Sequence, residues 1–334
     1  MERNLDNDTD VLAESYPLIR LLANGQYCSG EWLGQQLGVS RAAVWKKIQK
    51  LELLGLSCQS VRGKGYCIAG GVDLLENNTL QSFVDETLGV GAVRVDLRLQ
   101  IGSTNTVALE QAEHCASGYV CLAEQQKSGR GRLGRSWFSP FARNIYLSML
   151  WHFPAGAAAL EGLSLVVGLA VVRTLTRCGL VGATLKWPND VLVQNKKIAG
   201  ILLEMRGDAA GACSVVIGVG LNVVMSPEGA QQINQPWTDI VSHVPEIKRN
   251  EVAALLMYEL YQALSAFQNS GFLPFKKEWE RLDAFRGRAV RVHMGDQVVN
   301  GIAAGISDRG EFCLEIDNTL RVFSGGEVTI RPES

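Results

Sequence analysis

The segment SGRGRLGRSW, residues 128–137, which we call the ligand loop, combines small, flexible residues with permanently charged ones. The glycines are Gly129, Gly131 and Gly134, and the arginines are Arg130, Arg132 and Arg135. Their G-x-G-x-x-G spacing matches a dinucleotide-binding fingerprint, but that fingerprint requires a helix directly after the glycines. Here the chain runs through Pro140 into an aromatic-rich strand expected over 144–151. Since glycines let the backbone fold over a ligand and guanidinium groups neutralise anions, we expect a phosphate loop of another type.

A second candidate for anion chemistry is Lys186, which lies in an otherwise apolar strand directly before the sequence WPND, residues 187–190. Burying an ammonium group is costly unless it meets an anion, so a phosphate or carboxylate partner is expected. Gly218 and Gly220 interrupt a later apolar strand, which indicates that a ligand approaches the backbone there.

A third candidate is Ser103-Thr104-Asn105, which follows a strand expected over 93–101 and begins a helix. Short polar side chains and free amide groups at a helix start suit a carboxylate or a polar head group. An ordinary helix cap is the alternative reading of the same residues.

The first seventy residues predict a different kind of site. Gly38 ends one short helix, and Ser40 is a good N-cap for a helix over 41–54, so the two form a helix-turn-helix. On the second helix Val44, Ile48 and Leu51 form a core stripe. The opposite face carries Arg41, Ala42, Trp45, Lys46 and Gln49.

A hairpin should follow this helix, with a strand over 56–61 and with Arg62 and Lys64 at its tip. Residues 40–66 hold six cations, Lys47 among them, against one acid, whereas the whole chain has a net charge of −2. This concentration favours a winged helix that contacts DNA phosphates. A solvated three-helix domain or a protein-interaction module is the alternative.

Composition limits the remaining classes. The eight cysteines form no C-x-x-C pair and the four histidines are scattered, so we expect neither a disulfide scaffold nor a protein-bound metal. No apolar run is long enough to span a bilayer and the N-terminus is acidic, which predicts a cytoplasmic protein without a membrane partner.

The expected elements define an α+β multidomain protein. Residues 1–73 should form the winged helix, and residues 74–284 an α/β mixed-sheet domain with the ligand loop, an apolar helix over 160–177 and a hairpin turn at 195–197. A second long helix should end at Gly271. Residues 285–334 read as short strands, the last of them LRVFSGGEVTIR.

The stretches GRGRLGRSW, KWPNDV, KIAGILLE and GVGLN, in this order, resemble the biotin protein ligases. With the N-terminal winged helix, nearly the whole chain resembles the bifunctional biotin ligase and biotin operon repressor family. The resemblance implies a central domain similar to class II synthetases and a C-terminal SH3-like barrel. Leu133 departs from the family, where a further arginine is common at that position.

The family implies two reactions. Biotin and ATP, accompanied by Mg²⁺, give biotinyl-5′-AMP and pyrophosphate, and biotin then passes to a lysine of the biotin carboxyl carrier protein of acetyl-CoA carboxylase. Biotinyl-AMP would also act as corepressor, promoting a homodimer that binds operator DNA.

The implied site residues fall into four groups. Catalysis would rest on Lys186 and Arg132. Biotin would contact Ser103, Thr104, Asn105, Gln126, Gly129, Arg130, Gly131, Arg132, Lys186 and Gly220. The nucleotide would contact Arg132, Arg135, Trp137, Lys186, Asn222, Glu327, Arg331 and Trp237, an exposed aromatic expected to stack on adenine. DNA would contact Ser40, Arg41, Ala42, Trp45, Lys46, Lys47, Gln49, Arg62 and Lys64.

Other functions stay open at this point. The chain would be a ligase with a vestigial winged helix if the basic wing had no target. A non-catalytic transcription factor that senses an adenylate would not need Lys186 and the arginine loop. A lipoate ligase, which shares a related fold, would lack the GRGRLGR loop.

Overall fold

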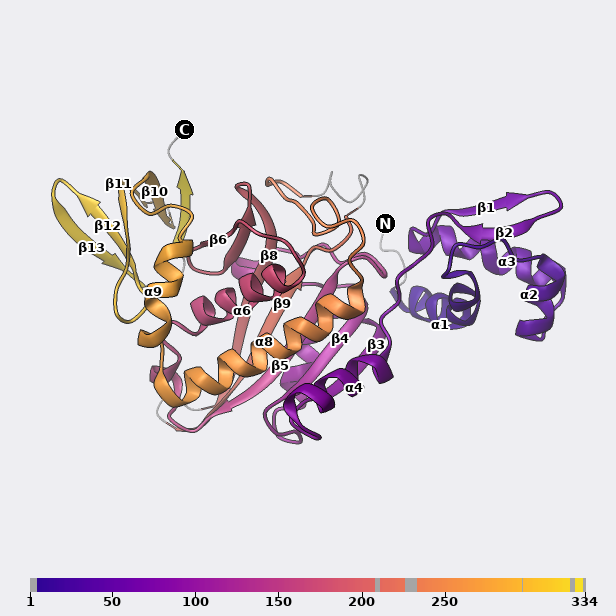
Figure 1. Cartoon of the computed structure of the whole chain (residues 1–334), viewed down its shortest axis with the longest axis horizontal. Coiled ribbons are helices and arrows are strands. Elements are labelled where there is room, and N and C mark those ends of the chain that lie inside the picture. The colour runs from indigo at the N-terminus through magenta and orange to yellow at the C-terminus, as the bar shows by residue number, and fades with distance from the viewer. Residues whose placement is uncertain (1–4, 208–210, 226–232, 296, 325–327, 333–334) are drawn as a thin grey trace.

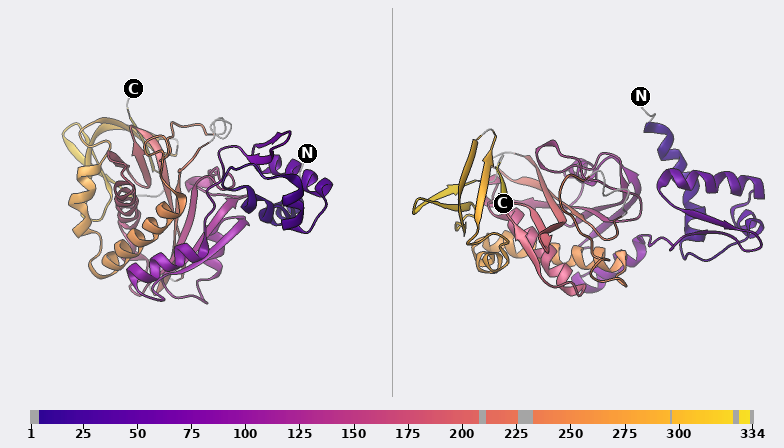
Figure 2. Two further views of the ribbon diagram at one scale, coloured as in Figure 1. Left: turned by 45° about the vertical axis from the view of Figure 1, so that its right-hand side comes forward. Right: turned by 90° about the horizontal axis from the view of Figure 1, so that it is seen from above.

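The structure is a computed structural model, and it describes residues 5–207, 211–225, 233–295, 297–324 and 328–332. Three units follow one another along its long axis, with the N-terminal unit at one end and the C-terminal sheet at the other (Figure 1). Two further views show the same separation (Figure 2). The ligand loop belongs to the central unit.

The N-terminal unit is a helix-turn-helix with a wing. Its elements are α1 (Leu5–Leu22), α2 (Gly30–Leu37), α3 (Arg41–Leu51), the 3₁₀ turn η1 (Glu52–Leu54) and the hairpin of β1 (Cys58–Val61) with β2 (Gly65–Ile68). Gly38 ends α2 in the left-handed region with φ 65°, and Ser40 caps α3 by accepting a hydrogen bond from the amide of Ala43. Both predicted helix signals are therefore confirmed. The predicted helix over 41–54 ends as an α-helix at Leu51, because its last turn tightens into η1.

The central unit is a mixed sheet of seven strands in the order β3-β4-β5-β9-β8-β7-β6. The strands are β3 (Arg94–Ile101), β4 (Tyr119–Gln126), β5 (Ile145–Phe153), β6 (Ala183–Lys186), β7 (Asp190–Val193), β8 (Lys196–Gly207) and β9 (Cys213–Leu221). Only the β3–β4 pairing among them is parallel, which confirms the predicted mixed sheet.

Each face of this sheet has its own helices. On β4, Val120 and Leu122 join the large core, whereas Tyr119 and Cys121 join a smaller cluster with Ala108 of α5 (Thr104–Glu110). The large core is covered by α4 (Asn77–Leu88), α6 (Leu163–Arg177) and α8 (Arg249–Ser270), and α6 and α8 lie in front of the sheet in Figure 1. Helix α5 packs on the other face, where the smaller cluster lies.

The C-terminal unit is an antiparallel sheet of five strands in the order β13-β12-β11-β10-β14. The strands are β10 (Ala289–Met294), β11 (Gln297–Ile306), β12 (Phe312–Ile316), β13 (Thr319–Phe323) and β14 (Val328–Pro332). The stretch LRVFSGGEVTIR contributes two of these, at opposite edges of the sheet. Among the described residues, no strand pairing joins β13 to β14.

Several predicted boundaries change. The apolar helix expected from residue 160 begins at Leu163. The expected hairpin turn lies one residue earlier, at Gln194 and Asn195, whose φ angles of 51° and 61° suit a tight two-residue turn. The second long helix stops before Gly271, as expected. Helices α4 and α9 (Leu273–Leu282) were not predicted, although Leu80, Phe83, Val84 and Leu88 of α4 have helical spacing.

The N-terminal unit packs on the central one. Leu74, Phe141 and Ala142 are buried in the same hydrophobic cluster as the winged-helix core. Phe141 is 1% exposed, and it lies four residues after Trp137, the last residue of the ligand loop. The segment after the ligand loop therefore forms part of the contact between the two units.

Candidate active site and DNA-binding surface

On the α5 face of the sheet, three glycines on β8 and β9 (Gly200, Gly218 and Gly220) leave the backbone uncovered by side chains of their own. Across β5, β9 and β8, Tyr146 pairs with Gly220, which pairs with Gly200. Two residues further along, Ser148 pairs with Gly218, which pairs with Leu202. A Cβ atom on Gly220 would lie 2.3 Å from Cε2 of Trp137, and one on Gly218 would lie 2.2 Å from Oδ1 of Asn105. In this structure the groups that approach these glycines are the side chains of Asn105 and Trp137, which line a pocket, and the approach of a ligand stays a prediction.

The ligand loop is a small hairpin over this pocket. The amide of Trp137 donates to the carbonyl of Gly129 over 2.8 Å, and the amide of Gly131 donates to the carbonyl of Arg135 over 2.7 Å. The turn η2 (Arg132–Gly134) forms its tip. Trp137 comes back to the sheet, and the Lys197 ammonium lies 5.4 Å from the centre of its ring.

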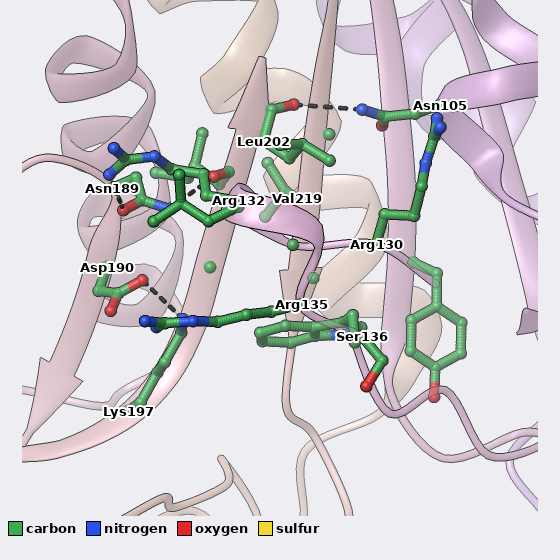
Figure 3. Close-up of a pocket in the computed structure, with 18 of the residues that line it drawn as sticks. Asn105, Arg130, Arg132, Arg135, Ser136, Asn189, Asp190, Lys197, Leu202 and Val219 are labelled. Atoms are coloured by element: carbon green, nitrogen blue, oxygen red, sulfur yellow. Dashed lines mark hydrogen bonds and ion pairs between the residues drawn. The ribbon is translucent and has the colours of Figure 1, made fainter. Parts of the chain in front are cut away.

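The side chains of the three loop arginines point to different parts of the pocket (Figure 3). Arg130 points toward Asn105 at one end of the pocket, while Arg132 and Arg135 extend toward Asn189, Asp190 and Lys197 at the other. The pocket thus has two ends of different chemistry. We call them the polar end and the cationic end.

The polar end is a hydrogen-bonded cluster. Its members are Ser103, Thr104, Asn105, Gln126, Arg130, Ser148 and Glu204. The amide and the hydroxyl of Thr104 donate to Oε1 of Gln126 over 2.9 and 3.1 Å. Ser103, Thr104 and Asn105 are each at most 6% exposed. Neutral donors and acceptors of this kind can orient a small polar group inside an otherwise dry pocket.

The Arg130 guanidinium binds to side chains at this polar end. It forms an ion pair with Glu204 over 2.9 Å and donates to the hydroxyl of Thr106 over 3.1 Å. Its charge is therefore balanced before any ligand arrives.

The cationic end is formed by Arg132, Arg135, Lys186 and Lys197 around a single acid, Asp190. Lys197 pairs with Asp190 over 2.6 Å, and Arg132 donates to Oδ1 of Asn189 over 3.1 Å. Burial lowers the pKa of Lys186 below its ordinary value; Asp190 opposes this shift, and repulsion from Lys197, Arg331 and Arg135 adds to it. Burial also lowers the pKa of Arg132. An anionic ligand would relieve both costs.

The other nucleotide residues expected from the resemblance lie around this pocket. Arg331 and Gly129 line an adjoining hollow together with Lys186. Asn222 and Trp237 lie on a further small hollow beside Trp137 and Lys197. The Asn222 amide donates to the carbonyl of Thr238 over 3.0 Å, so it fixes the neighbouring loop.

The description of Trp237 as exposed needs correction, because the side chain is half-buried. The backbone on either side of Trp237 pairs with Lys197. The amide of Lys197 donates to the carbonyl of Pro236, and the amide of Thr238 donates to the carbonyl of Lys197. Glu327 lies outside the described residues.

Some pocket residues did not stand out in the sequence. Glu204, Lys197 and Ser148 lie on strands whose apolar alternation was recognised, but their neighbours depend on strand register. Asn189 was visible as part of WPND, although its contact with the loop arginine was not expected.

The helix-turn-helix presents the expected faces. Val44, Ile48 and Leu51 are at most 4% exposed, while Trp45 is 52% exposed. Arg41, Ala42, Lys46, Gln49, Arg62 and Lys64 are also exposed. Lys47 differs from these, since its ammonium donates to the carbonyl of Glu14 on α1 over 3.0 Å.

Two further findings concern the described part of the chain. It contains no group of three or more His, Cys, Asp or Glu side chains that could hold a metal ion. None of its helices has the length and apolarity that a membrane-spanning segment requires.

A pocket with a polar and a cationic end, beside a loop rich in glycine and arginine, defines a protein that activates a small acid with a nucleotide. Residues 98–222 match the biotin/lipoate A/B protein ligase family, residues 16–67 an HTH domain, and residues 285–331 the biotin protein ligase C-terminal domain. The chain belongs to the bifunctional biotin protein ligase and biotin operon repressor family.

Individual relatives agree with this assignment. The bifunctional ligase/repressor BirA of Escherichia coli is 41% identical over 94% of this chain and 96% of its own length. The biotin–[acetyl-CoA-carboxylase] ligase of Mycobacterium tuberculosis is 35% identical over 74% of this chain and 94% of its own length. The biotin protein ligase of Aquifex aeolicus in complex with biotin and ATP superposes with a TM-score of 0.63, at 28% identity over 72% of this chain and 99% of its own.

Proposed function

We propose that this chain is a biotin protein ligase that also represses a biotin operon. It forms biotinyl-5′-AMP and pyrophosphate from biotin and ATP, and it transfers biotin to a lysine of the carrier protein of acetyl-CoA carboxylase. The observation that carries the enzymatic part is the two-ended pocket. A ureido ring matches the polar end, and a carboxylate that attacks a phosphate matches the cationic end.

Each end has a role in the reaction. Ser103, Thr104, Asn105 and Gln126 hold the ureido ring, and Arg130 closes that end through Glu204. Lys186 and Arg132 stabilise the negative charge that develops between the biotin carboxylate and the α-phosphate. Gly129, Gly131 and Gly220 leave room for the ligand, while Trp137 has to move away from Gly220 when biotin enters.

The nucleotide lies beyond the cationic end. Arg135 and Arg331 reach its phosphates, Trp237 stacks on adenine, and Asn222 holds the loop that carries Trp237. Glu327 belongs to the same group of proposed contacts. Mg²⁺ enters as part of Mg·ATP.

The winged helix binds operator DNA. Ser40, Arg41, Ala42, Trp45, Lys46, Lys47 and Gln49 of the second helix and Arg62 and Lys64 of the wing form the proposed contact. Biotinyl-AMP is the corepressor, and it acts by promoting a homodimer that presents two winged helices to a palindromic site. The domains span residues 1–73, 74–284 and 285–334, and the last is an SH3-like barrel.

The enzymatic part is tested by mixing the purified protein with biotin, Mg·ATP and a carrier domain. We expect biotin-dependent release of pyrophosphate and a biotinylated carrier lysine. Absence of both products with an intact fold would contradict the ligase assignment.

The repressor part is tested by fluorescence anisotropy on DNA from upstream of a biotin biosynthesis operon, with and without biotin and Mg·ATP. Binding should require both ligands. Lys64→Ala should weaken it and reduce the salt dependence by about one counterion. Lys277→Ala, which removes an exposed cation from α9, should leave it unchanged. Equal effects of the two variants would contradict a contact through the wing.

A further inference from the structure

The turn that joins β6 to β7 begins directly after Lys186 and is held by two other parts of the molecule. Trp187 is buried, and its indole N–H donates to the carbonyl of Gly310 in the C-terminal unit over 3.0 Å. The carbonyl of Pro188 accepts a hydrogen bond from the hydroxyl of Ser164 on α6 over 2.9 Å. These contacts fix the turn at the cationic end of the pocket.

Asn189 is the last residue of this turn, and its side chain connects β8 to the ligand loop. Its Nδ2 group donates to the carbonyl of Ile201 over 2.9 Å, and its backbone carbonyl accepts from the amide of the same residue over 2.9 Å. Its Oδ1 atom accepts from the guanidinium of Arg132 over 3.1 Å (Figure 3). The loop arginine is therefore attached to a turn that is itself held in place.

The two partners fix the orientation of the Asn189 amide group. A backbone carbonyl can only accept a hydrogen bond, so Nδ2 must face Ile201. A guanidinium group can only donate, so the amide oxygen must face Arg132. Exchanging the oxygen and the nitrogen would break both hydrogen bonds, and Asn189 thus presents an acceptor to the loop in one orientation.

The acceptor that Arg132 meets on Asn189 is neutral, whereas Arg130 of the same loop pairs with the carboxylate of Glu204. A carboxylate balances the charge of the guanidinium group that it binds. An amide oxygen directs a guanidinium group but adds no negative charge beside the anion that this group would bind. The same loop is thus attached by an ion pair at the polar end and by a neutral acceptor at the cationic end.

We propose that Asn189 is a positioning residue for adenylation, which holds Arg132 at the place where the biotin carboxylate meets the α-phosphate and leaves its charge to the ligand. The proposal rests on the proposed function, in which Arg132 stabilises the negative charge that develops between these two groups. The hydrogen bond gives a loop side chain the fixed position of the turn. Donors that are already oriented stabilise a transition state better, because they do not have to reorient during the reaction.

A double-mutant cycle tests whether Asn189 acts through Arg132. Pyrophosphate release gives kcat and the KM for biotin, and circular dichroism checks the fold. Asn189→Ala alone should lower kcat about tenfold or more, because a hydrogen bond to a charged group is lost. The KM for biotin should change less than about threefold, because the ureido ring binds at the other end of the pocket. In Arg132→Met, the same asparagine substitution should change kcat by less than about twofold.

Arg130→Met is the matched control background. Arg130 belongs to the same loop, but its contacts are Glu204 and Thr106 at the polar end. Asn189→Ala should therefore lower kcat about tenfold in Arg130→Met, as it does in wild type. The contact of Asn189 with β8 is lost in every background, so a purely structural effect of the substitution would appear in all three.

A loss of kcat that persists in Arg132→Met would show that Asn189 supports the sheet through Ile201, and it would overturn the proposal. An unchanged kcat in Asn189→Ala, or an altered circular dichroism spectrum in that variant, would overturn it as well. So would a loss that disappears in both arginine backgrounds, because the coupling would then belong to the whole loop. A wild-type protein that releases no pyrophosphate with biotin would overturn the proposed function together with this inference. An active wild type with equal losses in all three backgrounds would overturn the inference alone.

Discussion

Lys186 lies in an environment that is unfavourable for its charge but suited to binding an anion. It lies at the end of β6, faces Asp190 across the β6–β7 pair, and has other cations around it. Burial lowers its pKa, and the repulsion from Lys197, Arg331 and Arg135 acts in the same direction. The cations around Lys186 repel one another, and an anion bound among them would reduce this repulsion.

Lys186→Met should separate these two effects. We expect adenylation to fall by a factor of about 10² or more, because a donor to the developing charge is lost. The unliganded protein should become more stable by about 1 kcal/mol at pH 7, because the substitution removes a partly buried cation that neighbouring cations repel. The folded-state pKa lies below the ordinary 10.5, so the unfolded chain binds more protons between these two values, and wild-type stability rises with pH through that window. The variant should lack this rise in urea unfolding at pH 7 and pH 10, and equal curves for both proteins would contradict the prediction.

At the scale of elements, strands β4 to β9, helix α5 and the ligand loop all supply residues to the pocket, and the glycines on β8 and β9 decide its depth. Gly200 and Gly220 are register neighbours beneath the indole of Trp137. A Cβ atom on Gly220 would lie 2.3 Å from the indole, whereas one on Gly200 would lie 2.9 Å from it. A methyl group at position 200 would therefore displace the indole less than one at position 220.

A graded pair of variants tests this arrangement. Gly220→Ala should displace Trp137 and raise the Kd for biotin about tenfold or more, whereas Gly200→Ala should raise it less. Trp137→Leu added to Gly220→Ala should recover part of the binding, since the smaller side chain leaves space. Titration of biotin binding by calorimetry measures all three, and the reverse order of the two alanine variants would contradict the geometry.

Some residues of the candidate site could be predicted from the sequence, and others could not, because they depend on how the elements pack. Lys186, the arginine loop and Ser103-Thr104-Asn105 stood out because their types are unusual in an apolar context or at a helix start. Glu204 did not stand out, because its role depends on the register that places Leu202 opposite Gly218 and on the position of α5 above them. Alternation along one strand gives its two faces but not its neighbours on the next strand. The three loop arginines likewise looked equivalent, and only the folded loop separates Arg130 from the others.

At the scale of the whole molecule, the connection between the DNA-binding unit and the central sheet is held by a buried ion pair. Arg249 at the start of α8 and Glu124 on β4 are 1% and 0% exposed and lie 2.8 Å apart. Glu124 accepts from the amide of Leu75, and Arg249 donates to the carbonyl of Asp73, so both hold the linker. Glu124 also precedes Gln126 of the polar end by two residues, which places the linker and the ligand pocket on the same strand.

Breaking this pair should free the linker. Arg249→Met leaves the Glu124 carboxylate buried without a counter-charge, a change that costs about 3–5 kcal/mol, whereas Arg249→Met with Glu124→Leu should cost less than the first substitution alone. Arg177→Met is the control, because it breaks a pair with Glu259 in which the arginine is 45% and the glutamate 11% exposed, and neither residue contacts the linker. Urea unfolding measures stability, and a glutamate-specific protease reports linker release by cleavage after Glu76. Faster cleavage is expected in Arg249→Met but not in Arg177→Met. Equal cleavage in these two variants would mean that the linker is held by other contacts, and the ion pair would then stabilise only the interior of the central domain.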